Sequence, residues 1–187
     1  ANAVLQRGKG GAAKAVPLGG AYSGTAPTDL QWRLETEAAS LVPGYDWAVI
    51  SGASIAAGNW NATVNVPPDT ARTGYRINVR SRAAGGAVLD SKASNSFTVG
   101  VLVEAAGQSN MQAQFNGVSA GPGLANKCAW WSGTQWVRTS SMQFTAAVAA
   151  LSDLLGLPVG FATTAVSATD AREHAPAHTS TDGAVSA

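Results

Sequence analysis

Residues 99–106 read Val99-Gly100-Val101-Leu102-Val103-Glu104-Ala105-Ala106, a run that is apolar almost without interruption. Continuous apolar runs of this length are typical of parallel strands that are covered on both faces. The run ends at Gly107, a residue type that lets the chain turn sharply. It therefore predicts the first strand of a parallel sheet. It also divides the 187 residues into two halves that differ in their pattern of apolar and polar residues.

The sequence after this run predicts a long loop over 112–139, then a helix and a second buried strand. Apolar residues recur at helical spacing from Ser140 or Ser141 to Leu155, before a Gly and a Pro that favour a helix end. The residues on the apolar face are Phe144, Val148, Leu151 and Leu155.

The second buried strand is predicted over 159–166, which is again mostly apolar. A strand, a crossover helix and a second strand form a unit whose two strands run parallel. Residues 99–187 are therefore predicted to form a partial α/β segment with a flavodoxin-like parallel sheet. One helix cannot cover both faces of such a sheet, so we expect partner chains or a further C-terminal part of the protein to complete it.

The sequence before the run indicates an antiparallel β-sandwich over residues 1–98. Apolar and polar residues alternate in short segments that Gly, Pro, Asn and Asp separate, which is the pattern of strands with one buried face. Trp32, Trp47 and Trp60 are expected in the core of this sandwich. The predicted strands are 3–7, 30–35, 46–51, 61–66, 75–80, 87–91 and 96–100.

Composition excludes several classes of function. The chain has 12 Lys and Arg against 11 Asp and Glu, a net charge of +1, and no basic run that would follow a phosphate backbone, so we expect no nucleic-acid partner. No apolar stretch approaches the length of a membrane span, so we expect no membrane insertion. A single cysteine, Cys128, excludes a zinc site built from several cysteines, and we expect neither a metal nor another cofactor.

The most informative motif is Gly107-Gln108-Ser109-Asn110-Met111, directly after the first buried strand. Ligands of open α/β sheets bind outside the carboxyl ends of the strands, so Ser109 stands where chemistry is expected. The same residue types are also ordinary turn formers. Spacing alone leaves both interpretations open.

The block from Val101 to Met111 resembles the nucleophile block of the SGNH hydrolases, in particular the carbohydrate esterases similar to sialate O-acetylesterase. The segment 146–169 is similar to the next block of that family, and the N-terminal half to the β-domain that often precedes the esterase core. The resemblance implies that Ser109 is the nucleophile that deacetylates O-acetylated sugars. We expect Gln108 and Asn110 to contact the substrate.

The resemblance also implies where the oxyanion hole and the general base lie. The turn at Ser167 corresponds to the family's oxyanion-hole turn, although the family carries glycines there. The Asp-x-x-His block that supplies the general base has no counterpart in the 187 residues, so we expect the base to lie outside this sequence. His174, four residues after Asp170, is the alternative base, but the polar segment around it also fits a solvated tail.

The loop tryptophans leave two interpretations open. Trp130, Trp131 and Trp136 are either a sugar-stacking surface near Ser109 or side chains buried against the β-domain. The first hypothesis for function is therefore a serine carbohydrate esterase that acts on acetylated polysaccharide. The alternative is a non-catalytic glycan-binding or structural component of a larger assembly, such as a phage decoration or tail protein. Both favour an extracellular, periplasmic or virion-surface location.

Overall fold

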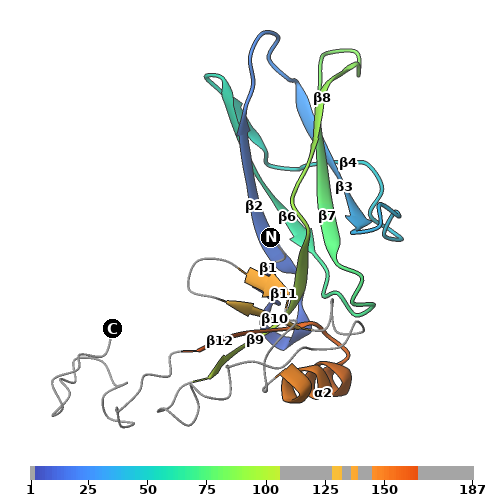
Figure 1. The fold of residues 1–187 in the computed structure, drawn as a ribbon. Coiled ribbons are helices and arrows are strands. Elements are labelled where there is room, and N and C mark those ends of the chain that lie inside the picture. Colours follow the sequence, from blue (N-terminus) through green and yellow to red (C-terminus); the bar gives the residue numbers. More distant parts are fainter. Residues whose placement is uncertain (1–2, 106–127, 132–135, 139–144, 164–187) are drawn as a thin grey trace, which may run out of the picture. The chain divides into compact units, whose positions relative to one another are not determined.

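The computed structural model describes residues 3–105, 128–131, 136–138 and 145–163 (Figure 1). Strands predominate in this part of the chain, and its one α-helix is α2 (Thr145–Leu155). The chain divides into two compact units. The first is Leu5–Val99, and the second is Gly100–Ala187 together with the short segment Asn2–Val4.

The first unit holds two antiparallel sets of strands (Figure 1). One set has the order β2-β6-β5, and the other has the order β4-β3-β7 with β8 on the opposite edge of β7. A short 3-10 helix, η1 (Lys9–Gly11), precedes them. The strands are β2 (Lys14–Ala21), β3 (Asp29–Thr36), β4 (Ala48–Val49), β5 (Ser54–Ala56), β6 (Asn59–Val66), β7 (Tyr75–Arg82) and β8 (Val88–Ala93).

Apolar residues from both sets of strands are buried in the first unit, as strand alternation requires. Leu30 and Leu34 lie on one face of β3, and Ile77 lies opposite Leu34 on β7. β6 shows the same period of two, with every second residue buried from Ala62 to Val66. The strands predicted over 30–35 and 75–80 are thereby confirmed.

The other face of β3 is also covered, which the alternation did not predict. Gln31 is buried and accepts a hydrogen bond of 2.7 Å from Arg80 Nε. The Trp47 ring lies over the guanidinium groups of Arg33 and Arg80, 4.8 and 4.2 Å from its centroid. In these cation–π contacts, the single Trp47 ring covers the polar side chains of this face.

The prediction that three tryptophans form the core is therefore wrong. Trp47 is half-buried over the arginines, and Trp32 is half-buried in an edge-to-face contact with Tyr45 at 5.8 Å. Trp60 is also half-buried and lines a hollow of about 210 Å³ between β2 and β8. Smaller aliphatic side chains supply most of the buried core instead.

A buried acidic residue organises the turn between β6 and β7. Asp69 is fully buried, and its two carboxylate oxygens accept hydrogen bonds from the N–H groups of Thr73 and Gly74 at 3.1 and 2.9 Å. Burial raises the pKa of Asp69 above its usual value, and these N–H groups oppose that rise. The Tyr75 hydroxyl donates to the Pro68 carbonyl at 3.2 Å, which ties the start of β7 to the end of β6.

Three strands of the first unit differ from the prediction, and β5 is one that was not predicted. β2 was not predicted, because Pro17, Gly19 and Gly20 indicate a turn, yet the whole segment pairs with β6. The strand predicted over 46–51 is only Ala48–Val49. Edge strands tolerate Pro and Gly because one side needs no partner, which explains the miss in β2.

The second unit contains parallel strands. β9 (Phe97–Ala105) passes from the first unit into the second, and its second part pairs in parallel with β12 (Val159–Thr163), as the sequence predicts. β12 also pairs in parallel with β10 (Cys128–Trp131), and β10 pairs antiparallel with β11 (Trp136–Arg138). β1 (Ala3–Gln6) pairs with β9. The predicted loop over 112–139 is thus wrong for β10 and β11.

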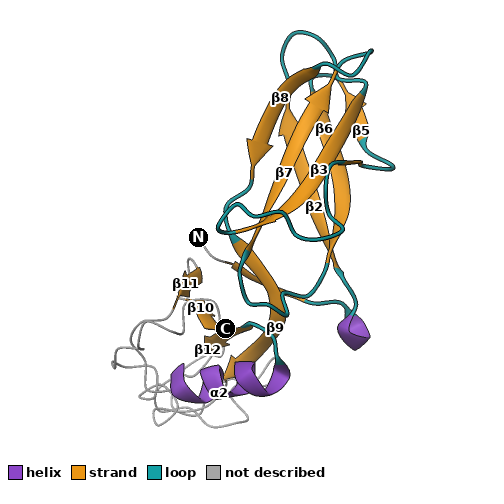
Figure 2. Cartoon of the chain, turned by 90° about the vertical axis from the view of Figure 1, so that its right-hand side faces the viewer, coloured by secondary structure: helices purple, strands orange, loops and turns teal. Residues whose placement is uncertain are grey.

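α2 packs against β10 and β12 (Figure 2). Val148 is buried on the predicted apolar face, whereas Leu155 is 39% exposed, so the prediction is wrong for the last residue of that face. Ser152 is buried instead, and its hydroxyl donates to the Leu157 carbonyl at 2.6 Å just beyond the helix end. Phe144 lies outside the described residues.

Candidate functional site

Parallel pairing brings the carboxyl ends of two strands to one edge of the sheet. Glu104 lies opposite Ala162, and Ala105 lies opposite Thr163, in the last two positions of β9 and β12. The motif with Ser109 begins two residues after Ala105. This edge is where ligands bind in open parallel sheets.

The predicted catalytic residues follow these strand ends in the chain but lie outside the described residues. This holds for Gln108, Ser109 and Asn110 after β9, and for Ser167 and His174 after β12. Their roles therefore stay predictions. The described part of the site is the sheet that precedes them.

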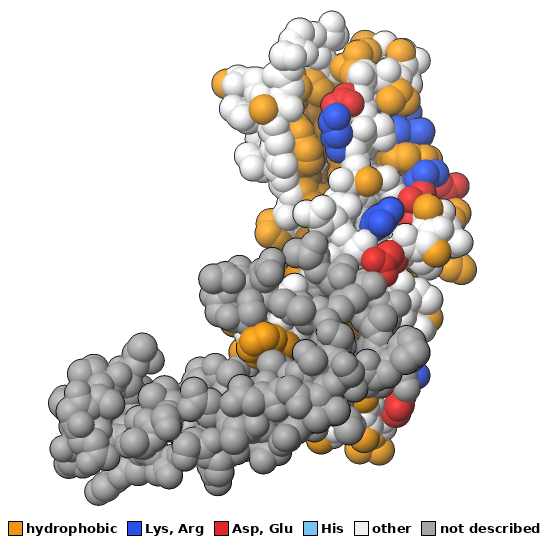
Figure 3. Space-filling view, viewed as in Figure 1, with side chains coloured by type: hydrophobic (Ala, Val, Ile, Leu, Met, Phe, Trp, Pro, Cys, Tyr) orange, Lys and Arg blue, Asp and Glu red, His pale blue; other side chains and the backbone are white. Residues whose placement is uncertain are grey.

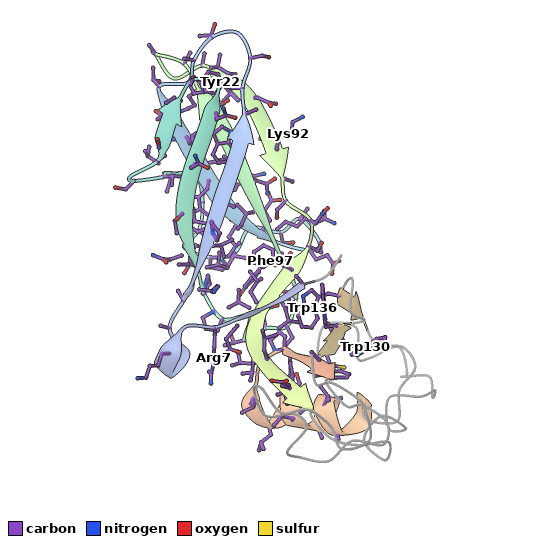
Figure 4. All side chains as sticks on the ribbon, turned by 90° about the vertical axis from the view of Figure 1, so that its left-hand side faces the viewer. Arg7, Tyr22, Lys92, Phe97, Trp130 and Trp136 are labelled. Carbon is purple, nitrogen blue, oxygen red and sulfur yellow. The ribbon has the colours of Figure 1, made fainter. Side chains whose placement is uncertain are left out.

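The face of this sheet toward α2 is an apolar cluster. Val103, Phe161 and Trp130 occupy neighbouring positions on β9, β12 and β10, and they pack with Cys128 and Val148. Trp130 is half-buried in this cluster (Figure 4), and its indole N–H has no hydrogen-bond partner among the described residues. Of the two interpretations of Trp130, the cluster favours packing.

The opposite face carries an aromatic groove. Trp136, Trp131, Ala162 and Glu104 form one row across β11, β10, β12 and β9, one position before the carboxyl edge. With Leu102, they line an open groove of about 540 Å³. Trp131 is 37% exposed, Leu102 is 41% exposed, and Glu104 is exposed.

The two tryptophans of the groove form a tilted pair. The ring centroids of Trp131 and Trp136 are 5.6 Å apart, with 57° between the ring planes. They lie directly opposite each other on the β10–β11 hairpin, so both project from the same face. Figure 4 labels Trp136 on β11.

Gly160 leaves room for its neighbours at the base of this groove. A Cβ on Gly160 would lie 2.7 Å from a methyl carbon of Leu102, 2.8 Å from Val4 Cβ and 3.1 Å from the Trp136 ring. Because no side chain is present there, these three residues close in over the β12 backbone. The absence of a side chain at Gly160 therefore allows the Trp136 ring to approach the β12 backbone.

The groove combines an aromatic stacking surface with a hydrogen-bond acceptor. Flat indole rings offer a large apolar surface with a polar tip, and the Glu104 carboxylate accepts hydrogen bonds. Mostly apolar walls with a few polar groups are typical of ligand sites. The sequence groups Trp136 with Trp130 and Trp131, but it does not show that Trp136 pairs with Trp131. The available signal was the Gly133-containing segment between Trp131 and Trp136, which fits a hairpin.

Comparison with known proteins adds no family: no family model matches the chain, and a search of curated proteins found no significant match. Among the described residues, no group of three His, Cys, Asp or Glu side chains could hold a metal ion. The helical part of the described chain is too short to cross a membrane.

Proposed function

We propose that the chain is a serine carbohydrate esterase of the SGNH type that deacetylates O-acetylated sugars. The observation that carries this proposal is the parallel register of β9 and β12, whose carboxyl ends share the edge at Ala105 and Thr163. The nucleophile motif begins immediately after that edge in the chain. A serine that follows such a strand end in the chain is well placed for acyl transfer.

The proposed reaction proceeds through an acyl-enzyme. Ser109 Oγ attacks the acetyl carbonyl while a general base takes its proton, and the sugar hydroxyl leaves with that proton. Water then releases acetate from Ser109. Backbone N–H groups at Ser109 and at the turn near Ser167 stabilise the oxyanion. Within the 187 residues, His174 is the candidate base, whereas the family uses the histidine of an Asp-x-x-His block.

The aromatic groove supplies substrate binding in this proposal. Trp131 and Trp136 stack on the sugar while Glu104 accepts hydrogen bonds from its hydroxyls. Because their row lies one position from the carboxyl edge, a bound sugar extends toward the residues that follow β9. Trp131 and Trp136 are therefore the proposed aromatic contacts to the substrate.

We also propose finer fold classes for the two units. The first is a β-sandwich in which β2-β6-β5 and β4-β3-β7-β8 are the two sheets, supported by buried residues from both sets. The bond from the Tyr75 hydroxyl to Pro68 matches the tyrosine corner of immunoglobulin-like sandwiches. The second is a partial α/β domain, supported by the parallel pairs and α2.

The test is acetate release from a panel of O-acetylated sugars by the full-length protein and by Ser109→Ala. We expect the substitution to lower kcat/KM by about a thousandfold or more, because removal of a nucleophile leaves only binding and the oxyanion hole. Ser54→Ala, at an exposed position of β5, is the matched control and retains full activity. Unchanged turnover by Ser109→Ala overturns the proposal.

The second candidate function is glycan binding without catalysis, and the pair of exposed Trp131 and half-buried Trp136 favours it. Here Ser109→Ala leaves polysaccharide binding unchanged, no acetate is released, and Trp131→Ala weakens retention on acetylated polysaccharide. Val49→Ala removes a similarly exposed apolar side chain from the first unit and serves as the control. Normal retention of Trp131→Ala and Trp136→Ala contradicts a role of the groove in either function.

A further inference from the structure

β8 is an exposed edge strand. All six of its side chains are exposed, including Val88 at 51% and Leu89 at 41%. It pairs with β7 on one side, and no strand pairs with its other side in the described part of the chain. An unpaired strand edge is a template for pairing with another strand.

The register with β7 shows which backbone groups of β8 point outward. Ser94 N–H donates to the Ile77 carbonyl at 2.8 Å, so this pair is hydrogen-bonded. Hydrogen-bonded and non-hydrogen-bonded pairs alternate along an antiparallel ladder. Lys92 and Asp90 therefore bond to β7, whereas Ser91 and Ala93 direct their backbone N–H and C=O groups outward.

The hydrogen bonding of Ser91 agrees with this assignment. Its N–H is held by the carboxylate of the preceding residue, at 2.8 Å from Asp90 Oδ1, and not by β7. An incoming strand that offers a carbonyl to Ser91 would release this carboxylate for another partner.

The charges on β8 make this edge complementary to itself. In antiparallel pairing of two copies centred on Ser91, Asp90 of each copy lies opposite Lys92 of the other. Ser91 is then a hydrogen-bonded pair with its own copy, and the two charge pairs fall at non-hydrogen-bonded positions, where side chains approach most closely. Pairing centred on Asp90 or on Lys92 would place like charges opposite each other. Figure 4 shows Lys92 on β8.

We propose that a second copy of this chain docks on β8 and forms a symmetric dimer through antiparallel pairing centred on Ser91. The reciprocal Asp90 and Lys92 pairs identify the occupant, because a twofold interface joins each residue to its complement in the other copy. Figure 3 shows adjacent acidic and basic side chains on the upper part of the molecule, where Figure 1 places β8.

The expected dimer is weak. A register shift between Asp90 and Val88 leaves Leu89 as a bulge, which confines regular pairing to the segment from Asp90 to Ala93. A contact this small fits a dissociation constant on the order of 0.1 mM.

The experiment is sedimentation equilibrium of the intact chain across its dissociation constant, for the wild type and charge variants. We expect Asp90→Lys and Lys92→Asp each to raise the dimer Kd at least about tenfold, because each replaces two opposite-charge pairs by like-charge pairs. An equimolar mixture of the two variants restores complementary pairs, and so does the double swap Asp90→Lys/Lys92→Asp. Circular dichroism checks that every variant is folded.

A second measurement tests the register. Ser91→Cys lies opposite its own copy and forms a disulfide-linked dimer on mild oxidation, since paired Cα atoms at about 5.5 Å suit a disulfide. Ala93→Cys is the matched control, because it lies opposite Leu89 and cross-links at most weakly. A wild type that remains monomeric, or a dimer that neither charge reversal weakens, overturns the proposal.

Discussion

The two units differ in the direction in which their paired strands run. In the first unit the strands pair antiparallel, and alternation marks most of them, although β2 and β6, and β3 and β7, are far apart in the chain. In the second unit, β12 lies between β9 and β10 and pairs in parallel with both, so strand order departs from chain order. Both units depend on contacts between distant segments, but the apolar strands of the second carry less alternation that marks their faces and neighbours.

The largest expected effect on stability is at the parallel pair of the second unit. A Cβ on Gly100 would overlap the carbonyl oxygen of Pro158, which accepts the Val101 N–H at 2.9 Å. We expect Gly100→Ala to lower the free energy of unfolding by about 3 kcal/mol or more, because backbone atoms have to shift. Hydrogen exchange is the measurement, with lost protection in β9 and β12 and retained protection in β3 and β7.

Gly160→Ala is the matched comparison for that substitution. Its Cβ would meet mainly side-chain atoms of Leu102 and Trp136, which can move, so the loss is smaller. If Gly160→Ala lowers the free energy of unfolding more than Gly100→Ala does, the close approach of β9 to Pro158 is not the most demanding contact of the second unit.

The first unit is most sensitive at Asp69. Asp69→Ala leaves the buried Gly74 N–H and the Thr73 N–H without their carboxylate acceptors. We expect a loss of about 3 kcal/mol in urea unfolding. Asp46→Ala, which removes only an exposed contact to the Trp47 N–H, should cost under about 1 kcal/mol. Equal losses in the two variants would show that burial of the Asp69 carboxylate is not what stabilises the turn.

The pH dependence of the first unit follows from the same residue. Burial raises the pKa of Asp69 above its usual value of 3.8, so the folded state binds this proton more tightly than the unfolded state. The contribution of Asp69 to stability is therefore complete below pH 3.8 and declines as the pH rises through the raised pKa. Urea unfolding of the wild type and Asp69→Asn across this range measures the difference.

The difference between those two proteins isolates Asp69 from other carboxyl groups. The hydrogen bond from Arg82 lowers the pKa of Asp29, so that group contributes in the opposite direction, and it does so in both proteins. If the free energy of unfolding of the wild type instead rises relative to that of Asp69→Asn as the pH increases, the raised pKa of Asp69 is contradicted.

The smallest expected effect is at the corner beside Asp69. Tyr75→Phe removes the hydrogen bond to the Pro68 carbonyl but keeps the edge-to-face contact with Phe97, whose ring centroid is 6.3 Å away. We expect a loss of about 1 kcal/mol in the free energy of unfolding. A loss as large as that of Asp69→Ala would mean that the tyrosine hydroxyl, and not the carboxylate, is the main anchor of the turn.

The sequence predicts much of this fold from period-two alternation and from the apolar run at Val99. It missed β2, where Pro17 and two glycines indicate a turn, because pairing with β6 overrides local preference. It also missed the β10–β11 hairpin, since runs of three or four residues carry little periodicity. For the site, the aromatic residues were visible in the sequence, but the row from Trp136 to Glu104 depends on register across four strands.

Peptide mass spectrometry of the full-length protein, quenched during reaction with an O-acetylated sugar, shows whether Ser109 carries an acetyl group during turnover. We expect an acetyl group on the peptide that contains Ser109, and we expect Ser109→Ala to lose both this acetyl group and acetate release. Acetate release without acetylation of Ser109, at a rate that Ser109→Ala does not change, would contradict this expectation.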